Sequence, residues 1–395
     1  YDYRERRGRP RPSLLAPANY VPRGIHWGPE DVIVVSGGAK GITAACALAV
    51  ARATRVRMAL LGRSAHPDAT PDDPASREVR QTLERFTAAG LTAEYYCCDV
   101  ANRDSVTATL GLIGTEMGPV TGLIHGAGLN RPRPLDQVPP GAAYEEAAPK
   151  VNGARHLLAA LAETPPKLVM AMTSIIGITG MPGNGWYGFS NEALALQLLA
   201  FAGAHPATQT QSVAYSIWRD EGMGARMGSV AHLQNQGIWA IPTEAGVRRF
   251  VHLFLNDPGH HQVAVAARLG GLDTWQWPQQ TGPKATRYLE ERLIHTPGVE
   301  SLFRSKLTLA RDPYLRDHHF QGSYLFPTVF GLEAMAQCAA HALGARTFRR
   351  VCFEEVRLDR PITVDPRLGA DILIRAEVLE TSAPDSPTVV ETSIY

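Results

Sequence analysis

The 395-residue sequence predicts an α/β domain with a doubly wound parallel sheet, followed by a smaller α+β domain. Two observations support this fold class. Short β-branched segments alternate with helical segments between residues 31 and 270, as is typical of a parallel sheet covered by helices. After about residue 302, one long apolar helix is followed by several strand-like segments, which favours an antiparallel sheet packed on a helix.

The expected elements of the first domain follow one another at short intervals. The expected strands are D-V-I-V-V-S (31–36), V-R-M-A-L-L-G (56–62), L-T-A-E-Y-Y-C-C-D-V (91–100), V-T-G-L-I-H-G-A-G (120–128) and K-L-V-M-A-M-T-S (167–174). Helices are expected over residues 43–53, 76–89 and 151–161. The active edge of such a sheet lies at the carboxyl ends of its strands.

The second domain is expected to begin with a strand at K-L-T-L-A (306–310) and to continue with a helix over residues 328–343. Apolar residues recur at helical spacing in that helix at Leu332, Met335, Ala336, Ala339 and Leu343. Further strands are expected over residues 351–358, 371–379 and 388–395. A polar segment rich in Pro and Gly, W-Q-W-P-Q-Q-T-G-P-K, separates the two domains.

These patterns predict a linker at residues 1–30, a parallel-sheet domain at 31–272, a second linker at 273–300 and a second domain at 301–395. The chain has no initiator Met and stops inside an expected strand. We therefore expect it to be part of a longer protein whose second domain is incomplete here.

The composition favours a globular cytoplasmic protein. Apolar residues make up 45% and charged residues 19%, and the net charge of +1 gives no reason to expect nucleic acid or membrane as a partner. There is neither a signal peptide nor an apolar run of the ~20 residues that a transmembrane helix needs. The five cysteines show no C-x-x-C spacing, so reduced thiols and no metal site are expected.

The segment V-I-V-V-S-G-G-A-K-G-I-T (32–43) carries a glycine-rich turn between an expected strand and an expected helix. Gly37, Gly38 and Gly41 allow close backbone approach, and the helix N-terminus can face a pyrophosphate. A glycine trio alone could be any tight turn, but the strand, the helix and the later segments favour a dinucleotide site.

The end of the second strand indicates which dinucleotide is bound. An NAD site usually has an acidic residue there to hold the ribose hydroxyls, whereas this chain has L-L-G-R-S. Arg63 and Ser64, with Lys40 from the glycine loop, suit the 2′-phosphate of NADPH. The alternative is that Arg63 is a solvated loop arginine.

Four residues suit the reduction of a ketone. Ser174 lies 13 residues before Tyr187, Asn191 follows Tyr187 by four residues, and Lys150 lies upstream in P-K-V-N-G. Tyr187 is expected to protonate the oxygen, Ser174 to hydrogen-bond it, and Lys150 to lower the pKa of Tyr187 and contact the cofactor ribose. Asn191 is expected to hold Lys150 or a water. Alternatively, Ser174 merely ends a strand and Lys150 is a surface residue.

This arrangement resembles the ketoreductase domains of polyketide and fatty acid synthases. Ordinary short-chain dehydrogenases, which share the Rossmann-type fold, carry the lysine four residues after the tyrosine, where Asn191 stands here. The segments G-G-A-K-G-I-T-A, L-L-G-R-S and K-V-N-G and the Ser174–Tyr187–Asn191 set are most similar to those of iterative enediyne synthases and of polyunsaturated fatty acid synthases.

The resemblance implies further contacts with the cofactor. It extends the glycine loop to Ile42, places Asp99 and Val100 at the adenine, and places Gly126, Ala127 and Gly128 beside the nicotinamide ribose. It makes S-I-W-R-D-E-G-M-G (216–224) the entrance of a substrate lid, and His125 is expected to be packed rather than catalytic.

Two segments depart from the family. Thr43 replaces a third glycine, and its hydroxyl is expected to cap the helix or contact a phosphate. L-N-R at Leu129 to Arg131 replaces an L-D-D signature, so the alcohol configuration is left open.

The second domain carries H-x-x-x-G-x-x-x-x-P at His318, Gly322 and Pro327. This resembles the catalytic-histidine motif of synthase dehydratases, which have a hot-dog fold, and implies that His318 removes the α-proton of a β-hydroxyacyl thioester. The paired aspartate is expected beyond residue 395, so this chain alone should reduce but not dehydrate. The alternative is that His318 and His319 form a structural pair or an incidental metal binder.

Together these resemblances imply NADPH-dependent reduction of a β-ketoacyl chain on the phosphopantetheine of an acyl carrier protein. Dehydration would follow, within an iterative type I polyketide synthase that makes an enediyne polyene. The expected partners are the carrier protein, other synthase domains and a second copy in a homodimer. The alternatives are a polyunsaturated fatty acid synthase ketoreductase, a non-catalytic nucleotide-fold scaffold and a free-standing short-chain dehydrogenase.

Overall fold

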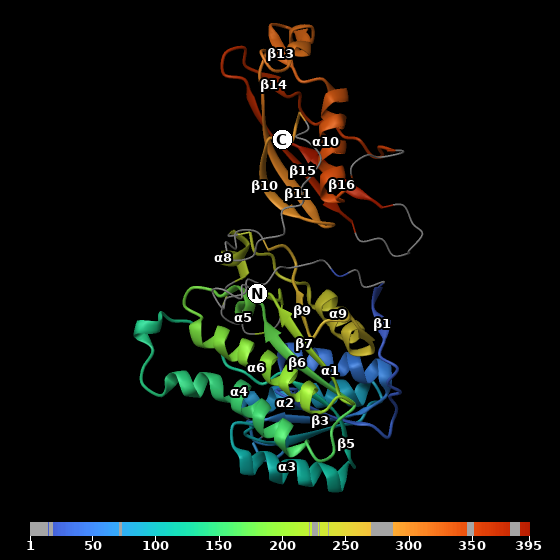
Figure 1. Ribbon diagram of the computed structural model, residues 1–395, viewed down its shortest axis with the longest axis vertical. Helices are drawn as coiled ribbons and strands as arrows, with labels where there is room; N and C mark the ends of the chain where they lie inside the picture. Colours follow the sequence, from blue (N-terminus) through green and yellow to red (C-terminus); the bar gives the residue numbers. More distant parts are fainter. Residues whose placement is uncertain are drawn as a thin grey trace. The chain divides into compact units, whose positions relative to one another are not determined.

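The computed structural model describes residues 15, 19–70, 73–220, 222, 228, 230–235, 237–269, 287–345, 351–379 and 388–395. The chain divides into two compact units, one formed by Asn19–Trp275 and the other mainly by Gln276–Tyr395. Both are drawn in Figure 1.

A seven-stranded parallel sheet forms the centre of the first unit, in the order β4-β3-β2-β5-β6-β7-β9. Its strands are β2 (Val32–Ser36), β3 (Arg57–Gly62), β4 (Ala93–Cys97), β5 (Val120–His125), β6 (Leu168–Ser174), β7 (Gln209–Tyr215) and β9 (Gln262–Val265). The chain runs outward from β2 to β3 and β4, and then returns to β5 on the other side. This confirms the predicted doubly wound sheet and places its switch point, where ligands bind in such folds, between β2 and β5.

Helices cover both faces of this sheet. They are α1 (Gly41–Thr54), α2 (Pro74–Ala88), α3 (Arg103–Glu116), α4 (Ala142–Ala160), α5 (Ile176–Thr179), α6 (Gly185–Ala204), α8 (Val230–Asn235) and α9 (Thr243–Leu255), with a 3₁₀ turn η2 (Leu135–Gln137). α1 contacts α2 and α9, whereas α4 contacts α3 and α6; α4 and α6 lie side by side in Figure 1. A cluster of buried apolar residues that includes Val106, Leu157 and Leu194 joins α3, α4 and α6 to the sheet.

Residues 19–30 were predicted to be linker, but they belong to the first unit. β1 (Val21–Pro22) pairs with β8 (Asn256–Asp257) in an antiparallel ladder. The buried Arg23 guanidinium donates hydrogen bonds to the carbonyl of Leu253 and to the side-chain oxygens of Gln209 and Gln211, each at 3.0 Å. The segment has no periodicity that would reveal these contacts, because the partners of β1 and of the Arg23 side chain lie late in the sequence.

The second unit is built on a four-stranded antiparallel sheet in the order β10-β11-β15-β16. Its strands are β10 (Glu291–Thr296), β11 (Glu300–Leu307), β15 (Ala370–Val378) and β16 (Val390–Ile394), and α10 (Thr328–Ala342) packs on β11, β15 and β16. A 3₁₀ turn η3 (Pro313–Arg316) leads to a small sheet of β12 (His319–Phe320), β13 (Ser323–Leu325) and β14 (Thr363–Val364). The helix and the strands at 371–379 and 388–395 match the prediction, and a helix on an antiparallel sheet is the layout expected of a hot-dog domain.

Three predictions for the second unit need correction or lie outside the structure. Residues 288–300 are not linker, because Tyr288 is buried in the core and β10 and the start of β11 form there. The segment 351–358 pairs with no strand among the described residues, and its apolar side chains are exposed. The residues of W-Q-W-P-Q-Q-T-G-P-K fall outside the described part of the chain, as do several of the expected lid entrance.

Candidate active site

A cavity of about 270 Å³ lies at the carboxyl ends of β2, β3 and β4, beside the switch point of the sheet. It is lined by residues that the sequence singled out for a dinucleotide, namely Gly37, Lys40, Arg63, Ser64, Asp99, Val100, Ala127 and Gly128. Its other lining residues are Ala39, Leu61, Gly62, Tyr95, Cys98, Leu129 and Pro149.

The glycine loop brings two backbone segments close together. Gly37 has a φ of 68°, and a Cβ there would lie 3.0 Å from the backbone of Ala127. A Cβ on Gly126 would come within 2.4 Å of the Thr43 hydroxyl oxygen, so Thr43 packs against that glycine. Of the two roles expected of Thr43, capping α1 is excluded because Thr43 lies inside the helix, and the N-cap residue Lys40 also makes no side-chain cap. The first N–H groups of α1 are therefore left for a bound anion.

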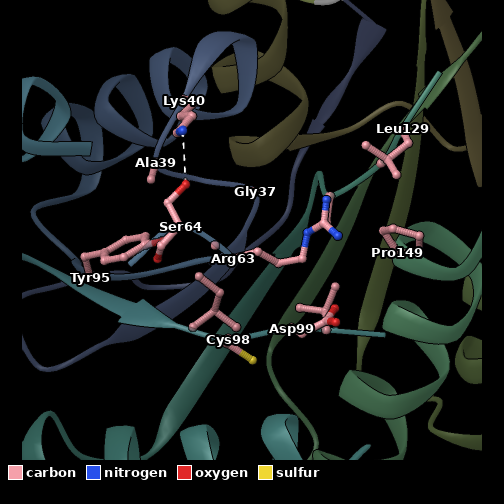
Figure 2. A pocket seen from close by; sticks show the side chains of 15 residues that line it. Gly37, Ala39, Lys40, Arg63, Ser64, Tyr95, Cys98, Asp99, Leu129 and Pro149 are labelled. Atoms are coloured by element: carbon pink, nitrogen blue, oxygen red, sulfur yellow. Dashed lines mark hydrogen bonds between the residues drawn. The ribbon is translucent and has the colours of Figure 1, made fainter. Parts of the chain in front are cut away.

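Two cationic side chains stand at one edge of the cavity. Figure 2 shows Lys40 and Ser64 pointing toward each other, with Arg63 extending into the cavity. The Lys40 ammonium donates to the Ser64 hydroxyl at 3.1 Å and lies 3.4 Å from the Glu78 carboxylate. Arg63 is exposed, and its guanidinium makes no hydrogen bond or ion pair with the described residues.

The remaining predicted cofactor residues shape the loop without lining the cavity. A Cβ on Gly38 would meet the Val35 side chain at 2.6 Å, and Gly41 begins α1 with a φ of 55°. Ile42 lies beside Gly222, where a Cβ would approach its side chain to 2.4 Å. Gly126 packs against the helix as described above.

His125 is packed, as predicted. Its Nδ1 lies 2.6 Å from the Ser36 hydroxyl, and its Nε2 lies 3.0 Å from the Lys150 carbonyl oxygen and so must donate to it. Burial is the main reason why the pKa of His125 falls to about 3. The neutral imidazole therefore ties β2 and β5 to the backbone of α4 at Lys150.

The structure brings Ser174, Tyr187 and Asn191 together. Ser174 ends β6, Tyr187 lies in the first turn of α6, and Asn191 follows one turn later. The Ser174 side chain acts on Tyr187 and opposes the rise of its pKa. The Asn191 amide donates to the Tyr187 carbonyl at 2.7 Å, and its buried Oδ1 has no partner among the described residues.

Lys150 lies on α4 and is only 3% exposed. Its ammonium donates to the Met172 carbonyl at 2.9 Å, and no described hydrogen bond joins it to Asn191. Its side chain occupies the space beside Gly128, where an added Cβ would lie 2.9 Å from Lys150 Cε. Burial lowers the pKa of Lys150 to about 8.

The expectation that Lys150 lowers the pKa of Tyr187 is wrong for this structure. Burial raises the pKa of Tyr187 above its ordinary value, against the opposing effect of hydrogen bonds with Ser174 and Asn191. The physical reason is that the phenol loses its hydration, while the Lys150 ammonium is directed at a backbone carbonyl.

Sequence reasoning missed two residues of the site. Tyr95 lines the cavity and donates to the Ser64 carbonyl at 2.7 Å, and burial raises its pKa to about 12, so its hydroxyl remains a donor. Nothing in the strand pattern marked it. Glu146 is buried on α4 and its charge acts on Tyr187. The sequence did contain a signal for Glu146, because it lies four residues before Lys150 and the two therefore share one face of a helix.

His318 lies in the second unit, and local geometry explains its motif. Its Nδ1 lies 3.0 Å from the Leu325 carbonyl oxygen, so Nδ1 carries the proton and Nε2 keeps a free lone pair. Gly322 makes the turn between β12 and β13 with a φ of 85°, and Pro327 is the N-cap of α10. His319 instead packs its ring against Tyr324.

Within the described ranges, no group of three or more His, Cys, Asp or Glu side chains could hold a metal ion. None of the helices described there combines the length and apolarity needed to cross a bilayer. All five cysteines are free thiols.

Comparison with protein families covers most of the chain. Residues 32–220 match the KR domain, and residues 288–384 match the polyketide synthase dehydratase domain. A polyunsaturated fatty acid synthase from Thraustochytrium sp. (strain ATCC 26185 / S-3) is 23% identical over 390 residues, which cover 87% of this chain and 13% of that protein. Erythronolide synthase EryA3 of Saccharopolyspora erythraea is 30% identical over 236 residues, or 59% of this chain and 7% of that protein. The chain thus spans a small part of each relative.

Solved structures share the fold of the first unit. A ketoreductase domain from the bacillaene assembly line superposes with a TM-score of 0.54 at 24% identity, covering 67% of this chain and 60% of that chain. An N-terminal ketoreductase from the macrolactin assembly line gives a TM-score of 0.51 at 24% identity, covering 62% and 46%. Residues 32–220 are thus similar to ketoreductase domains and residues 288–384 to polyketide synthase dehydratase domains, and the relatives are polyketide and polyunsaturated fatty acid synthases.

Proposed function

We propose that the first unit reduces a β-ketoacyl thioester, carried on an acyl carrier protein, to the β-hydroxyacyl form with NADPH. The observation that carries this proposal is that Ser174, at the end of β6, and Tyr187, in the first turn of α6, act on each other. The pair stands at the carboxyl edge of the sheet, in the unit that holds the buried Lys150 and the glycine-lined cavity. These are a proton donor, a second hydrogen bond and a cation, which are the parts that ketone reduction needs.

The residues around the cavity fit a nicotinamide dinucleotide. Gly37 suits the pyrophosphate because it has no Cβ to keep a phosphate away from the backbone of the loop. The uncapped N-terminus of α1 suits it because backbone N–H groups there can bind an anion. The Arg63 guanidinium, with Lys40 and Ser64, suits a 2′-phosphate, which favours NADPH over NADH. When bound, NADPH supplies the hydride that reduces the ketone carbon.

Side chains of the protein itself donate the proton and stabilise the charge on the ketone oxygen. The Tyr187 hydroxyl donates its proton to the ketone oxygen, and the Ser174 hydroxyl holds that oxygen by a hydrogen bond. The Lys150 ammonium, with a pKa of about 8, is mostly charged at neutral pH and stabilises the negative charge that develops. The free Oδ1 of Asn191 is a ready acceptor for a water that returns a proton to the site.

The second unit is proposed to contribute to the next step, loss of water from the β-hydroxyacyl chain. His318 would remove the α-proton through Nε2, because the Leu325 carbonyl fixes the proton on Nδ1. Other synthase domains and the carrier protein are the proposed partners.

The direct test is Tyr187→Phe. It should abolish NADPH-dependent reduction of acetoacetyl N-acetylcysteamine thioester, by more than about 100-fold in kcat, because the proton donor is lost. NADPH affinity, measured by fluorescence titration, should stay close to that of the wild type. Tyr144→Phe is the matched control, since Tyr144 is an exposed tyrosine on α4. Turnover that survives in Tyr187→Phe would refute the acid assignment, and failure of the wild type to bind NADPH would favour a non-catalytic scaffold.

A second test addresses the cofactor. Arg63→Ala should raise the KM for NADPH about 10-fold or more while changing the KM for NADH little, because only NADPH carries the 2′-phosphate. Arg52→Ala, an exposed arginine in the last turn of α1, is the control. An equal change in the KM for NADPH and for NADH would show that Arg63 does not bind the 2′-phosphate.

Two classes of synthase are candidates for the protein to which this chain belongs. In the second unit, the segments D-H-H-F (317–320), L-F-P-T-V (325–329) and G-L-E-A-M-A-Q (331–337) resemble enediyne synthases most and support enediyne polyene biosynthesis. The polyunsaturated fatty acid synthase relative, which aligns over 87% of this chain, supports the alternative. Reconstitution of the full-length synthase separates them, since a conjugated polyene absorbs at long wavelength and a fatty acid with isolated double bonds does not.

A further inference from the structure

Glu146 is a buried carboxylate in the reductase unit that none of the proposed catalytic steps uses. It lies on α4 one turn before Lys150 and is 3% exposed. Burying a carboxylate is costly unless it is paired or hydrogen-bonded, so its contacts indicate what it does. They lead from α4 to the beginning of the helix that carries Tyr187.

The first contacts hold the segment that follows β5. Glu146 Oε1 accepts a hydrogen bond from the backbone N–H of Arg131 at 3.1 Å, and Oε2 lies 3.9 Å from Nη2 of Arg133. The carboxylate therefore fixes the segment Leu129–Arg133, whose first residue lines the cavity.

The same segment, together with Leu135 of the η2 turn that follows it, contacts the beginning of α6. The backbone N–H of Arg133 donates to the Gly183 carbonyl at 2.7 Å. The side chain of Leu135 comes within 2.7 Å of the place where Gly185, the first residue of α6, would carry a Cβ. Tyr187 follows Gly185 by two residues, so a shift of the Leu129–Arg133 segment would also displace the Tyr187 phenol.

Glu146 also acts on Tyr187 by charge. Its carboxylate raises the pKa of Tyr187, in addition to the larger effect of burial, and so favours the protonated phenol that donates the proton. The other groups that face this region are Ser174 and Asn191, which oppose the rise of that pKa, and the cations Lys150 and Arg133. The side chain of Arg131 is paired with Glu145 at 3.2 Å.

We propose that Glu146 is a positioning residue of the reductase site, which clamps Leu129–Arg133 against the beginning of α6 and keeps a negative charge facing Tyr187. The proposal rests on the proposed reductase function. It predicts that removing the charge changes the proton transfer even when the hydrogen bond to Arg131 is kept.

The experiment compares Glu146→Gln with Glu145→Gln across pH. Glutamine retains an acceptor for the Arg131 N–H but carries no charge. The alkaline limb of the kcat/KM profile for acetoacetyl N-acetylcysteamine thioester should move to lower pH by about half a unit or more, because loss of the carboxylate lowers the pKa of Tyr187. Glu145, whose side chain is 65% exposed, should leave the profile unchanged when replaced.

Two further variants distinguish the effect of the Glu146 charge from the effect of losing its contacts. Glu146→Asp keeps the charge and should keep the alkaline limb near that of the wild type. Glu146→Ala removes both contacts and should lower kcat about 10-fold or more with little change in NADPH affinity. An identical profile for Glu146→Gln and Glu145→Gln would overturn the proposal while the reductase function stands. Absence of NADPH-dependent turnover in the wild type would instead overturn the proposed function itself.

Discussion

Gly128 illustrates how a single missing side chain determines the position of Lys150. Its backbone lines the cavity, and the Lys150 side chain fills the space where a Cβ would stand. The φ of Gly128 is not in the left-handed region, so an alanine would suffer no backbone strain there. The need for glycine is therefore steric and comes from a residue on another helix.

We expect Gly128→Ala to displace the Lys150 ammonium from the Met172 carbonyl. Because Lys150 is enclosed, the displacement should lower kcat about 10- to 100-fold without unfolding the domain. Steady-state kinetics with the β-ketoacyl thioester measure this effect. Gly203→Ala on α6 is the control, since nothing lies within 4 Å of an added Cβ there. Equal activity of the two variants would show that the Lys150 side chain can move aside for the added methyl group without loss of function.

At the scale of the element, the segment at residues 19–30 shows how an irregular stretch becomes part of a domain. β1 is only two residues long, and its ladder with β8 could not hold it alone. Arg23 adds three side-chain hydrogen bonds to partners in β7 and α9. The segment is thus attached to β7, β8 and α9 of the first unit.

Arg23→Ala should destabilise the reductase unit by about 2–4 kcal/mol, because buried acceptors on Gln209, Gln211 and Leu253 lose a charged donor. Chemical denaturation followed by intrinsic fluorescence measures the change. Arg52→Ala, an exposed substitution on α1, should cost less than about 0.5 kcal/mol. A cost for Arg23→Ala as small as that of the control would mean that the Arg23 hydrogen bonds do not stabilise the unit.

At the scale of the whole molecule, each of the two units has its own apolar core. The second unit also buries a polar cluster in which the Ser301 hydroxyl lies 2.9 Å from Nδ1 of His295 and 3.0 Å from Nδ1 of His341. Burial lowers the pKa of His295 to about 4, assisted by the charge of His341, and also lowers the pKa of His341. Both imidazoles are therefore kept neutral in the folded state.

This cluster should make the second unit sensitive to acid. Because the folded pKa lies below the unfolded value of about 6.5, the unfolded chain takes up protons first as the pH falls. Stability should be complete above about pH 6.5 and should decline by about 1–3 kcal/mol toward pH 4.

Scanning calorimetry from pH 7 to pH 4 should resolve the transition of the second unit. His295→Gln should flatten its dependence on pH, whereas His319→Gln, an exposed neighbour of Tyr324, should not. A pH dependence that is the same in both variants would exclude the cluster as its source.

Much of the first unit was predictable because its signals are local. A buried parallel strand such as β2 shows itself as a β-branched run, and the glycine turn after it follows directly in the sequence. The boundaries were less accurate. α4 begins at Ala142 rather than near Val151, with Pro149 inside it, because packing against α3 and α6 overrides the local preference against proline. The strand expected at residues 351–358 did not form, because alternation alone provides no neighbouring strand with which to pair.

The sequence by itself determined the fold class, the position of the glycine loop, and the set of Lys150, Ser174, Tyr187 and Asn191, since each rests on spacing within short segments. Only the tertiary structure decided that the pKa of Tyr187 is raised, that Glu146 faces it, and that Arg23 attaches the N-terminal segment. These features depend on burial and on contacts between residues far apart in the chain, and spacing along the sequence encodes neither.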